Sequence, residues 1–277
     1  MVKALVYKGG LQLSNWIVTS KDLYLLVKML GGKVLIGITN PFPHYQEDDE
    51  LEKEWESMFK KLNKMGLVDY IQGELKFEGQ FIEAMWVLAR SNLVAEIVTD
   101  HQEQSIFYFS DDRVIECLKE SEMSFKVIQH PAPNHTMKQI IFPRMLMGIE
   151  DRAVRVGDPL YIIPREYLSY CEHLAIFNVN QVAINNNMDS DCLLVKQFNK
   201  SIQRKIHTNR LMMFYRDKNE WNIEGVHVLA SPSYNWTLRM MRKNGIEWLE
   251  AKQATGDKLV REIVGVLERV KENHLVK

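Results

Sequence analysis

The chain has 277 residues, of which 46% are hydrophobic and 26% charged, so it can bury a large core, and disordered and fibrous classes are excluded. Its 35 Lys and Arg against 36 Asp and Glu give a formal charge of −1. Such a balance supplies no strong positive field for nucleic acid phosphates. No apolar run approaches the roughly 18 residues that cross a bilayer, and residues 1–10 lack the apolar stretch of a signal peptide. We therefore expect a cytoplasmic protein without stable membrane insertion.

The first third of the chain predicts helices around a short strand. Thr19 and Asp22 have the spacing of a capping box, and leucines then recur at the helical period up to Gly31, where a helix should end. Acidic residues 47–50 begin a second helix, and Gly66 lies where it should end. The region continues with a strand over Glu74–Phe77 and a third helix carrying Phe81, Met85 and Leu88. This order is similar to a winged helix.

From Leu93 the apolar period changes from about 3.6 residues to 2, which is typical of strands. Short polar links join four runs of strand length, so neighbouring strands should be antiparallel. After them, Asn134 can cap a helix that Pro143 should end or kink. The four predicted strands are Leu93–Thr99, Ser105–Phe109, Arg113–Leu118 and Ser124–His130.

The second half repeats this programme. Helices are predicted at Pro164–Ala175 and Asp189–Ile206, and a final helix follows Thr255, with Val260, Ile263, Val264, Leu267 and Val270 as its apolar face. Asn244-Gly245 is a strong hairpin signal. The four strands predicted between these helices are Leu211–Arg216, Trp221–Leu229, Tyr234–Met241 and Ile246–Ala251.

The repetition predicts a pseudo-twofold, duplicated α+β protein in which helices flank a central antiparallel sheet. Its two halves, 1–150 and 151–277, should pack as one globular unit. Residues 1–140 carry 15 basic and 20 acidic positions, whereas 141–277 carry 20 basic and 16 acidic positions. This modest asymmetry indicates no dedicated nucleic-acid surface.

Motifs for catalysis, nucleotide binding or metal binding are not found in the sequence. There is no glycine-rich phosphate loop, G-x-S-x-G turn or C-x-x-C pair. A hydrolase that uses His130, His135 or Cys171 is an alternative that we do not favour, because their spacing fits neither a metal site nor a nucleophile–base pair. We expect a protein that is not an enzyme, with no catalytic residue, no cofactor and no metal, and with buried cysteines.

Two methionine pairs are the positive hint of binding. Adjacent strand residues point to opposite faces, so one residue of Met212 and Met213, and one of Met240 and Met241, must lie on the second face of the sheet. Either helices cover that face as well, or part of this adaptable apolar surface is open to a partner.

Three phrases of the sequence resemble a known family. They are Thr19–Leu26 with Leu30-Gly31-Gly32, then Met65–Asp69, then Met85–Arg90 before the first long strand. On these residues the chain resembles the EspG-like chaperones of type VII (ESX) secretion systems, and within them the EsaE-like branch of Gram-positive bacteria outside the mycobacteria. The resemblance implies the same pseudo-twofold α+β fold and no enzymatic activity. It also implies a chaperone that binds new secretion substrates in the cytosol and covers the apolar end of a helical hairpin.

The resemblance also implies where the partner binds. A hairpin loop of the first half and helices of the second contact the substrate in the mycobacterial branch, and the matching helical face here is Asp189–Ile206 or Val260–Val270. A short polar loop and few Gly and Ala residues speak against a PE/PPE substrate. A secreted toxin with a helical targeting domain, such as an EsaD-like nuclease or an LXG-type protein, fits better, and the membrane ATPase of the system is a further expected partner. The expected partner-binding residues are Asp100, His101, Gln102, Glu103, Gln104, Met212, Met213, Met240 and Met241.

A different class of function stays open. The winged-helix-like order over Leu51–Arg90 is compatible with a nucleic-acid-binding regulator. The acidic excess of that half of the chain speaks against it, because phosphate binding requires clustered basic residues.

Overall fold

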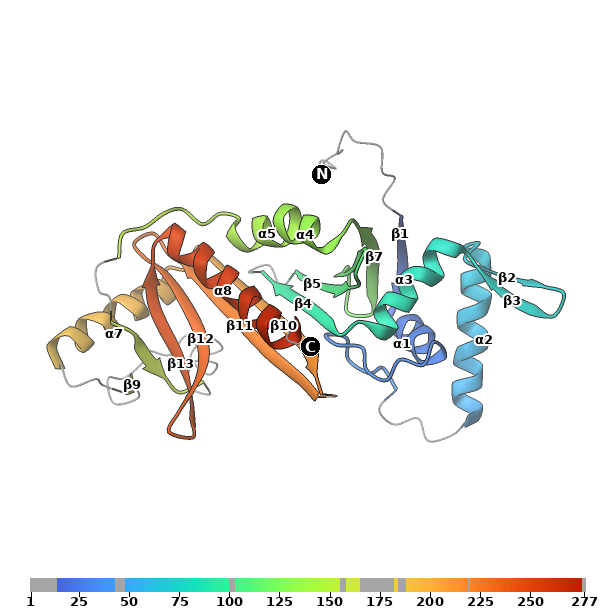
Figure 1. Ribbon diagram of the computed structural model, residues 1–277, viewed down its shortest axis with the longest axis horizontal. Coiled ribbons are helices and arrows are strands. Elements are labelled where there is room, and N and C mark those ends of the chain that lie inside the picture. Colours follow the sequence, from blue (N-terminus) through green and yellow to red (C-terminus); the bar gives the residue numbers. More distant parts are fainter. Residues whose placement is uncertain are drawn as a thin grey trace. The chain divides into compact units, whose positions relative to one another are not determined.

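The computed structural model describes residues 14–42, 48–99, 103–154, 158–164, 182–183, 188–218 and 220–275. The chain forms two compact units (Figure 1). Unit 1 combines Met1–Ser91 with Phe107–Pro133, and unit 2 combines Asn92–Ile106 with Asn134–Lys277. The division into similar halves at residue 150 stays a prediction beside this one.

Unit 1 starts with β1 (Asn15–Thr19) and α1 (Ser20–Met29). The capping box predicted at their junction is confirmed: the Thr19 hydroxyl accepts the Asp22 N–H at 3.2 Å, and the Asp22 carboxylate accepts the Thr19 N–H at 2.8 Å. Lys61 also pairs with Asp22 and so links the next helix to this cap. The further elements of the unit are α2 (Asp48–Lys64), β2 (Val68–Ile71), β3 (Glu74–Phe77), α3 (Gly79–Arg90), β6 (Val114–Lys119) and β7 (Ser124–His130).

The strands of unit 1 are antiparallel, and β7 lies between β1 and β6. Helices α1 and α3 pack on each other. Their contact is apolar, because Leu23, Leu26, Phe81 and Met85 are all fully buried. The predicted helix–strand–helix order is observed, with one strand more than expected: β2 and β3 form a hairpin between α2 and α3.

Unit 2 holds a run of strands in the order β4-β10-β11-β12-β13-β8-β9, all antiparallel. The predicted strand positions are confirmed, but β10–β13 are longer than their apolar runs. The strands are β4 (Leu93–Val98), β5 (Gln104–Phe109, shared with unit 1), β8 (Leu160–Ile162), β9 (Val182–Ala183), β10 (His207–Asp217), β11 (Glu220–Ala230), β12 (Asn235–Lys243) and β13 (Ile246–Ala254). The helices are α4 (Pro133–Thr136), a π-helical turn (Met137–Ile141), α5 (Phe142–Leu146), α7 (Met188–Gln203) and α8 (Gly256–Leu275).

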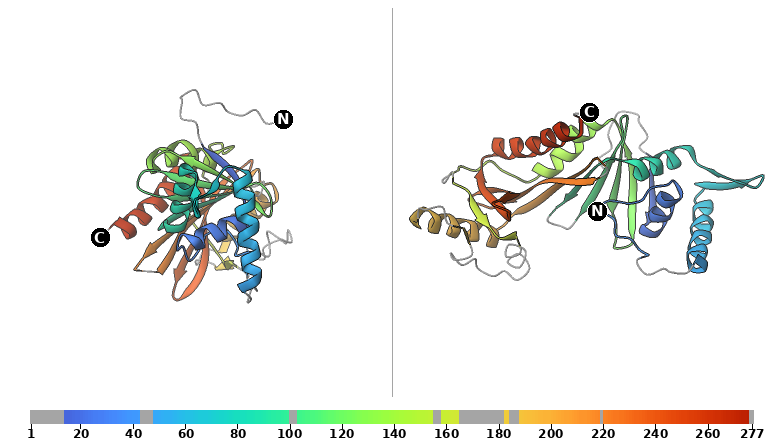
Figure 2. Two further views of the ribbon diagram at one scale, coloured as in Figure 1. Left: turned by 90° about the vertical axis from the view of Figure 1, so that its right-hand side faces the viewer. Right: turned by 60° about the horizontal axis from the view of Figure 1, so that its bottom comes forward.

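Helices cover both faces of the unit 2 strands, which lie between α7 and α8 in Figure 2. On the α7 face, the rings of Phe198 and Trp236 meet edge to face at 4.9 Å, and the Trp236 indole N–H donates to Ser201 at 2.9 Å. On the α8 face, Arg269 contacts Glu224 of β11 at 3.0 Å. Asn235 was expected on a wetter face, but it is buried and donates to the Glu150 carbonyl at 2.7 Å.

Two helical expectations need correction. Pro143 does not end its helix, because the Phe142 N–H bonds to the Met137 carbonyl five residues back, and this π-helical turn brings the chain into α5 with Pro143 in its first turn. In α8 the buried stripe is Leu259, Ile263, Val266 and Val270, so the predicted face is shifted and Val260 is 40% exposed. The predicted helix Pro164–Ala175 lies outside the described residues beyond its first residue.

The predicted α+β class is confirmed, with a large antiparallel sheet flanked by helices. Among the described residues, no helix combines the length and the apolar character that a membrane crossing requires.

Candidate functional site

A groove with a volume of about 520 Å³ opens on the α7 face of unit 2. Four neighbouring strands contribute to it, and most of the side chains on them are apolar. The lining consists of Arg210 and Met212 of β10, residues 223–227 of β11, residues 238–240 of β12, Glu247 and Leu249 of β13, and Pro164. We call this hollow the β11–β12 groove.

The groove exists because two long hairpins diverge. Strands β10 and β11 pair from His207↔Ala230 to Asp217↔Glu220, whereas β11 and β12 pair only from Ala230↔Asn235 to His227↔Leu238. Beyond Leu238 each hairpin continues without the other, as Figure 1 shows for β10–β11 and β12–β13. The space between them is not filled by α7, which packs over the paired end.

Gly225 shapes the floor of the groove. A Cβ atom at this position would lie 2.4 Å from the Met212 sulfur and 2.9 Å from the Leu211 carbonyl oxygen. The methionine side chain therefore lies directly over the glycine, in space that any other residue would occupy. Glycine within a strand is costly for folding, so its place here is explained by this close approach.

The rim of the groove leaves apolar side chains in solvent. Ile223 is 56% exposed and Met240 is 49% exposed, whereas Leu238, one strand turn from Met240, is 1% exposed. Arg210 adds a charge at one end and contacts Glu96 at 3.6 Å. The site is thus an apolar hollow with a polar edge, a composition typical of protein-binding and ligand-binding surfaces.

The structure separates the predicted methionines. Met212 and Met240 both line the groove, whereas Met213 is 1% exposed and Met241 lies on the opposite face of β12 from Met240. Both readings of the pairs therefore apply to different parts of one face, since α7 covers some of it and the groove leaves the rest open.

Of the predicted loop, Asp100, His101 and Gln102 lie outside the described residues. Glu103 is exposed, and its carbonyl accepts the Thr99 N–H at 3.1 Å. Gln104 donates to Glu96 at 2.5 Å, and Glu96 in turn contacts the groove residue Arg210. Partner binding by these residues stays a prediction.

Sequence reasoning missed Ile223, Gly225 and Leu249. A signal for the first two was present, because Gly225 interrupts a strand of otherwise good strand formers, and such a glycine often marks a close approach. No local signal marks where β11 and β12 part.

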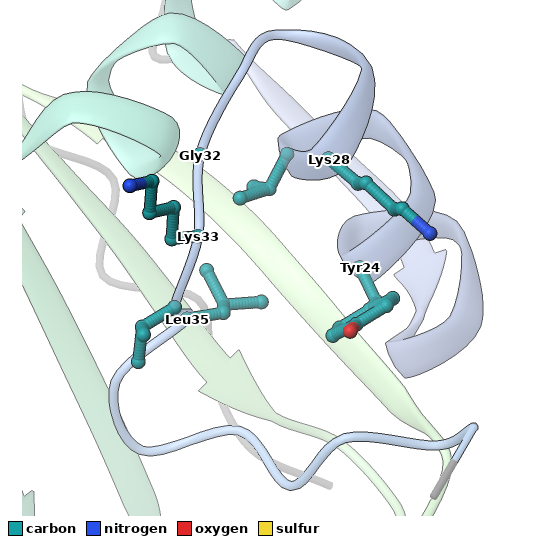
Figure 3. Close-up of a pocket in the computed structure, with 7 residues that line it drawn as sticks. Tyr24, Lys28, Gly32, Lys33 and Leu35 are labelled. Atoms are coloured by element: carbon teal, nitrogen blue, oxygen red, sulfur yellow. The ribbon is translucent and has the colours of Figure 1, made fainter. Parts of the chain in front are cut away.

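A smaller hollow of about 210 Å³ lies in unit 1, between α1 and the segment after it. Tyr24 and Lys28 of α1 line one side, and Gly32, Lys33 and Leu35 line the other (Figure 3). The two lysine side chains leave in opposite directions. They do not converge on a point where a ligand could be held.

The candidate catalytic groups are found in structural surroundings. His130 and Glu116 are buried, 2.6 Å apart, in unit 1, while His135 is exposed and Cys171 lies outside the described residues. Burial, with the neighbouring Glu116 carboxylate, raises the pKa of the Cys117 thiol, so this thiol stays protonated near neutral pH. Among the described residues, no three His, Cys, Asp or Glu side chains are grouped to hold a metal ion.

Comparison with known proteins bears on the fold. No known family matches the sequence, and no curated protein sequence matches it. Among solved structures, the chain adopts an EspG-like fold. The similar structure is the type VII secretion system chaperone EspG5 of Mycobacterium tuberculosis, solved in complex with the PE25-PPE41 dimer, with a TM-score of 0.58, 9% sequence identity, and coverage of 93% of this chain and 97% of that chain.

Proposed function

We propose that this protein is a cytoplasmic chaperone of a type VII secretion system, of the EspG-like kind and from its EsaE-like branch, which binds a secreted protein before export. The single observation that carries the proposal is the open apolar β11–β12 groove in a chain with an EspG-like fold. Its client is the helical targeting domain of a secreted toxin or an LXG-type protein, kept soluble and delivered to the membrane ATPase.

The groove supplies the energy that such binding needs. Fully burying an apolar side chain contributes roughly 1.5–3 kcal/mol, and Ile223 and Met240 are each about half exposed before a partner binds. Methionine is unbranched and polarizable, so Met212 and Met240 can adapt to clients of different shape. The same hydrophobic surface on a client would drive its aggregation if it were left in water.

Polar groups at the groove edge favour one orientation of the client. Arg210 is 48% exposed even though it contacts Glu96, so its guanidinium still has donors for a partner. Edge charges of this kind set specificity and association rate more than affinity. The proposed role is binding by shape, which requires no titrating side chain and fits a protein that is not an enzyme.

Co-expression tests the proposal. A tagged copy of this chain is produced with the helical domain of a secreted protein encoded beside it, and we expect the two to co-purify. Met240→Ser should weaken the complex, whereas Met123→Ser, at a methionine of similar exposure (52%) in unit 1, should not. Recovery of the client at equal levels with both variants would move the binding site away from the groove, and no complex with any such domain would refute the proposal.

A further inference from the structure

We infer that the β11–β12 groove binds an extended segment of its partner, which adds as a strand to the unpaired edge of β11 and carries apolar residues on one side and a carboxylate on the other. The inference rests on the proposed function, because it specifies which part of a client enters the groove. Three observations support it.

The backbone of β11 presents unused donors and acceptors to the groove. The Ser231 N–H donates to the Tyr234 carbonyl at 3.0 Å, which shows that odd-numbered residues of β11 direct their backbone groups toward β12. By this alternation, Gly225 and Ile223 also do so. The register with β12 ends at His227↔Leu238, so in the described part of the chain no strand lies across from these two residues.

The lining of the groove shows that it opens onto strand edges. A hollow above one face of a sheet is lined by alternate residues, because side chains alternate between faces. Here the consecutive residues 223–227 of β11 and 238–240 of β12 all line it. The hollow therefore extends between the two strands, where an added strand would lie.

An extended segment fits these edges better than a helix does. A strand brings its own N–H and C=O groups to pair with those of Ile223 and Gly225, whereas a helix uses its backbone groups internally. Unpaired strand edges are recognised in this way by many peptide-binding proteins. Side chains on one side of the added strand would meet Met212 and Leu249, which explains the apolar preference.

The other side of the added strand would meet an excess of positive charge. Glu224 lies 3.0 Å from Arg269 and 4.0 Å from Arg239, so one carboxylate serves two guanidinium groups. One terminal nitrogen of Arg269, Nη2, is buried without a hydrogen-bond partner. Both Glu224 and Arg239 line the groove. A carboxylate on the bound segment would pair with this cluster, and such charge-assisted bonds are strong.

Binding of synthetic peptides, followed by fluorescence anisotropy with the full chain, tests the inference. The probe is a nine-residue peptide that alternates Thr and Ile and has Glu at its centre, so that all Ile side chains lie on one side. A twin peptide is N-methylated at the two backbone nitrogens that would donate to β11. A second twin has Lys in place of Glu, and a third probe is an amphipathic helix of equal hydrophobicity.

We expect the strand peptide to bind, with protection of the Ile223 and Gly225 amides from hydrogen exchange. N-methylation should weaken binding on the order of tenfold or more, because two hydrogen bonds are lost. The Lys twin should bind more weakly, and Arg239→Gln should reduce the preference for Glu over Lys. The conservative variant Arg239→Lys should retain it.

Other outcomes overturn the inference. Equal binding of the N-methylated peptide would show that no strand is added, and absence of strand-peptide binding would have the same meaning. If the helical peptide binds instead and Met240→Ser weakens it, the proposed function stands while the strand inference fails. If the strand peptide binds but the secreted helical domain never co-purifies, the inference stands and the proposed client is wrong.

Discussion

The two faces of the unit 2 strands contain similar amounts of apolar surface but use it differently. On one face, α8 buries Leu259, Ile263 and Val266 against the strands. On the other face, α7 covers Trp236 and Leu229 but stops where the hairpins diverge, and Met240 and Ile223 stay in solvent. The comparison teaches that an apolar strand face becomes core or binding surface according to what lies over it, so variants on the two faces should separate stability from binding.

The largest effect on stability is expected in the covered part of the α7 face. Trp236 is completely buried, so Trp236→Ala removes its ring contact with Phe198 and its bond to Ser201 and leaves a cavity. We expect a loss of about 3–5 kcal/mol in the free energy of unfolding, measured by urea denaturation. Met240→Ala on the same face should change that free energy by less than about 0.5 kcal/mol. Similar losses for both would show that the groove is core.

The α8 face should respond next in size. Ile263 is 1% exposed and Val260 is 40% exposed, although they are neighbours on one helix. Ile263→Ala should cost about 2–4 kcal/mol, whereas Val260→Ala should cost about 0.5 kcal/mol or less. Thermal unfolding followed by circular dichroism measures both, and a larger loss for Val260→Ala would place the buried stripe of α8 as the sequence predicts it.

An intermediate effect is expected at the floor of the groove. Gly225→Ala places a methyl group where the Met212 sulfur lies, so the methionine must move into the groove. We expect a loss of about 1–2 kcal/mol in unfolding free energy from this overpacking. Client binding, measured by isothermal titration calorimetry, should fall more than stability does. In the double variant Gly225→Ala with Met212→Ala the clash with the side chain is gone, and unaffected binding in the single variant would contradict our account of the floor.

The smallest effect on stability is expected at the rim. Ile223 and Ile246 are both 56% exposed, but only Ile223 lines the groove. Ile223→Ser and Ile246→Ser should each change the unfolding free energy by about 0.5 kcal/mol or less. Only Ile223→Ser should weaken client binding in a pull-down assay. Equal weakening by both variants would remove the distinction between groove and surface.

Local signals in the sequence predicted most elements of the fold. The Thr19–Asp22 box begins α1, and Asn244 and Gly245 both have positive φ, 54° and 78°, as the hairpin turn requires. The alternation that places Trp236, Leu238 and Met240 on one face is also correct. These features depend on a few neighbouring residues, which is why a sequence can predict them.

The groove could not be predicted, because it depends on contacts between distant segments. Leu238 and Met240 have the same phase in β12, yet one is 1% and the other 49% exposed. The difference comes from the point at which β11 leaves β12 and from the end of α7, and neither is encoded in the alternation. In α8, two overlapping apolar stripes are present, and packing on β10 and β11 selects the one that contains Leu259.

Site-specific photo-crosslinking in living cells tests the central claim most directly. A benzophenone amino acid replaces either Met240 in the groove or Val260 on α8, and crosslinked proteins are identified by mass spectrometry. We predict that the Met240 probe crosslinks a type VII secretion substrate through or beside its helical domain and that the Val260 probe does not. Substrate crosslinked only from Val260, or from neither position, would contradict the claim that this groove is where the protein holds its client.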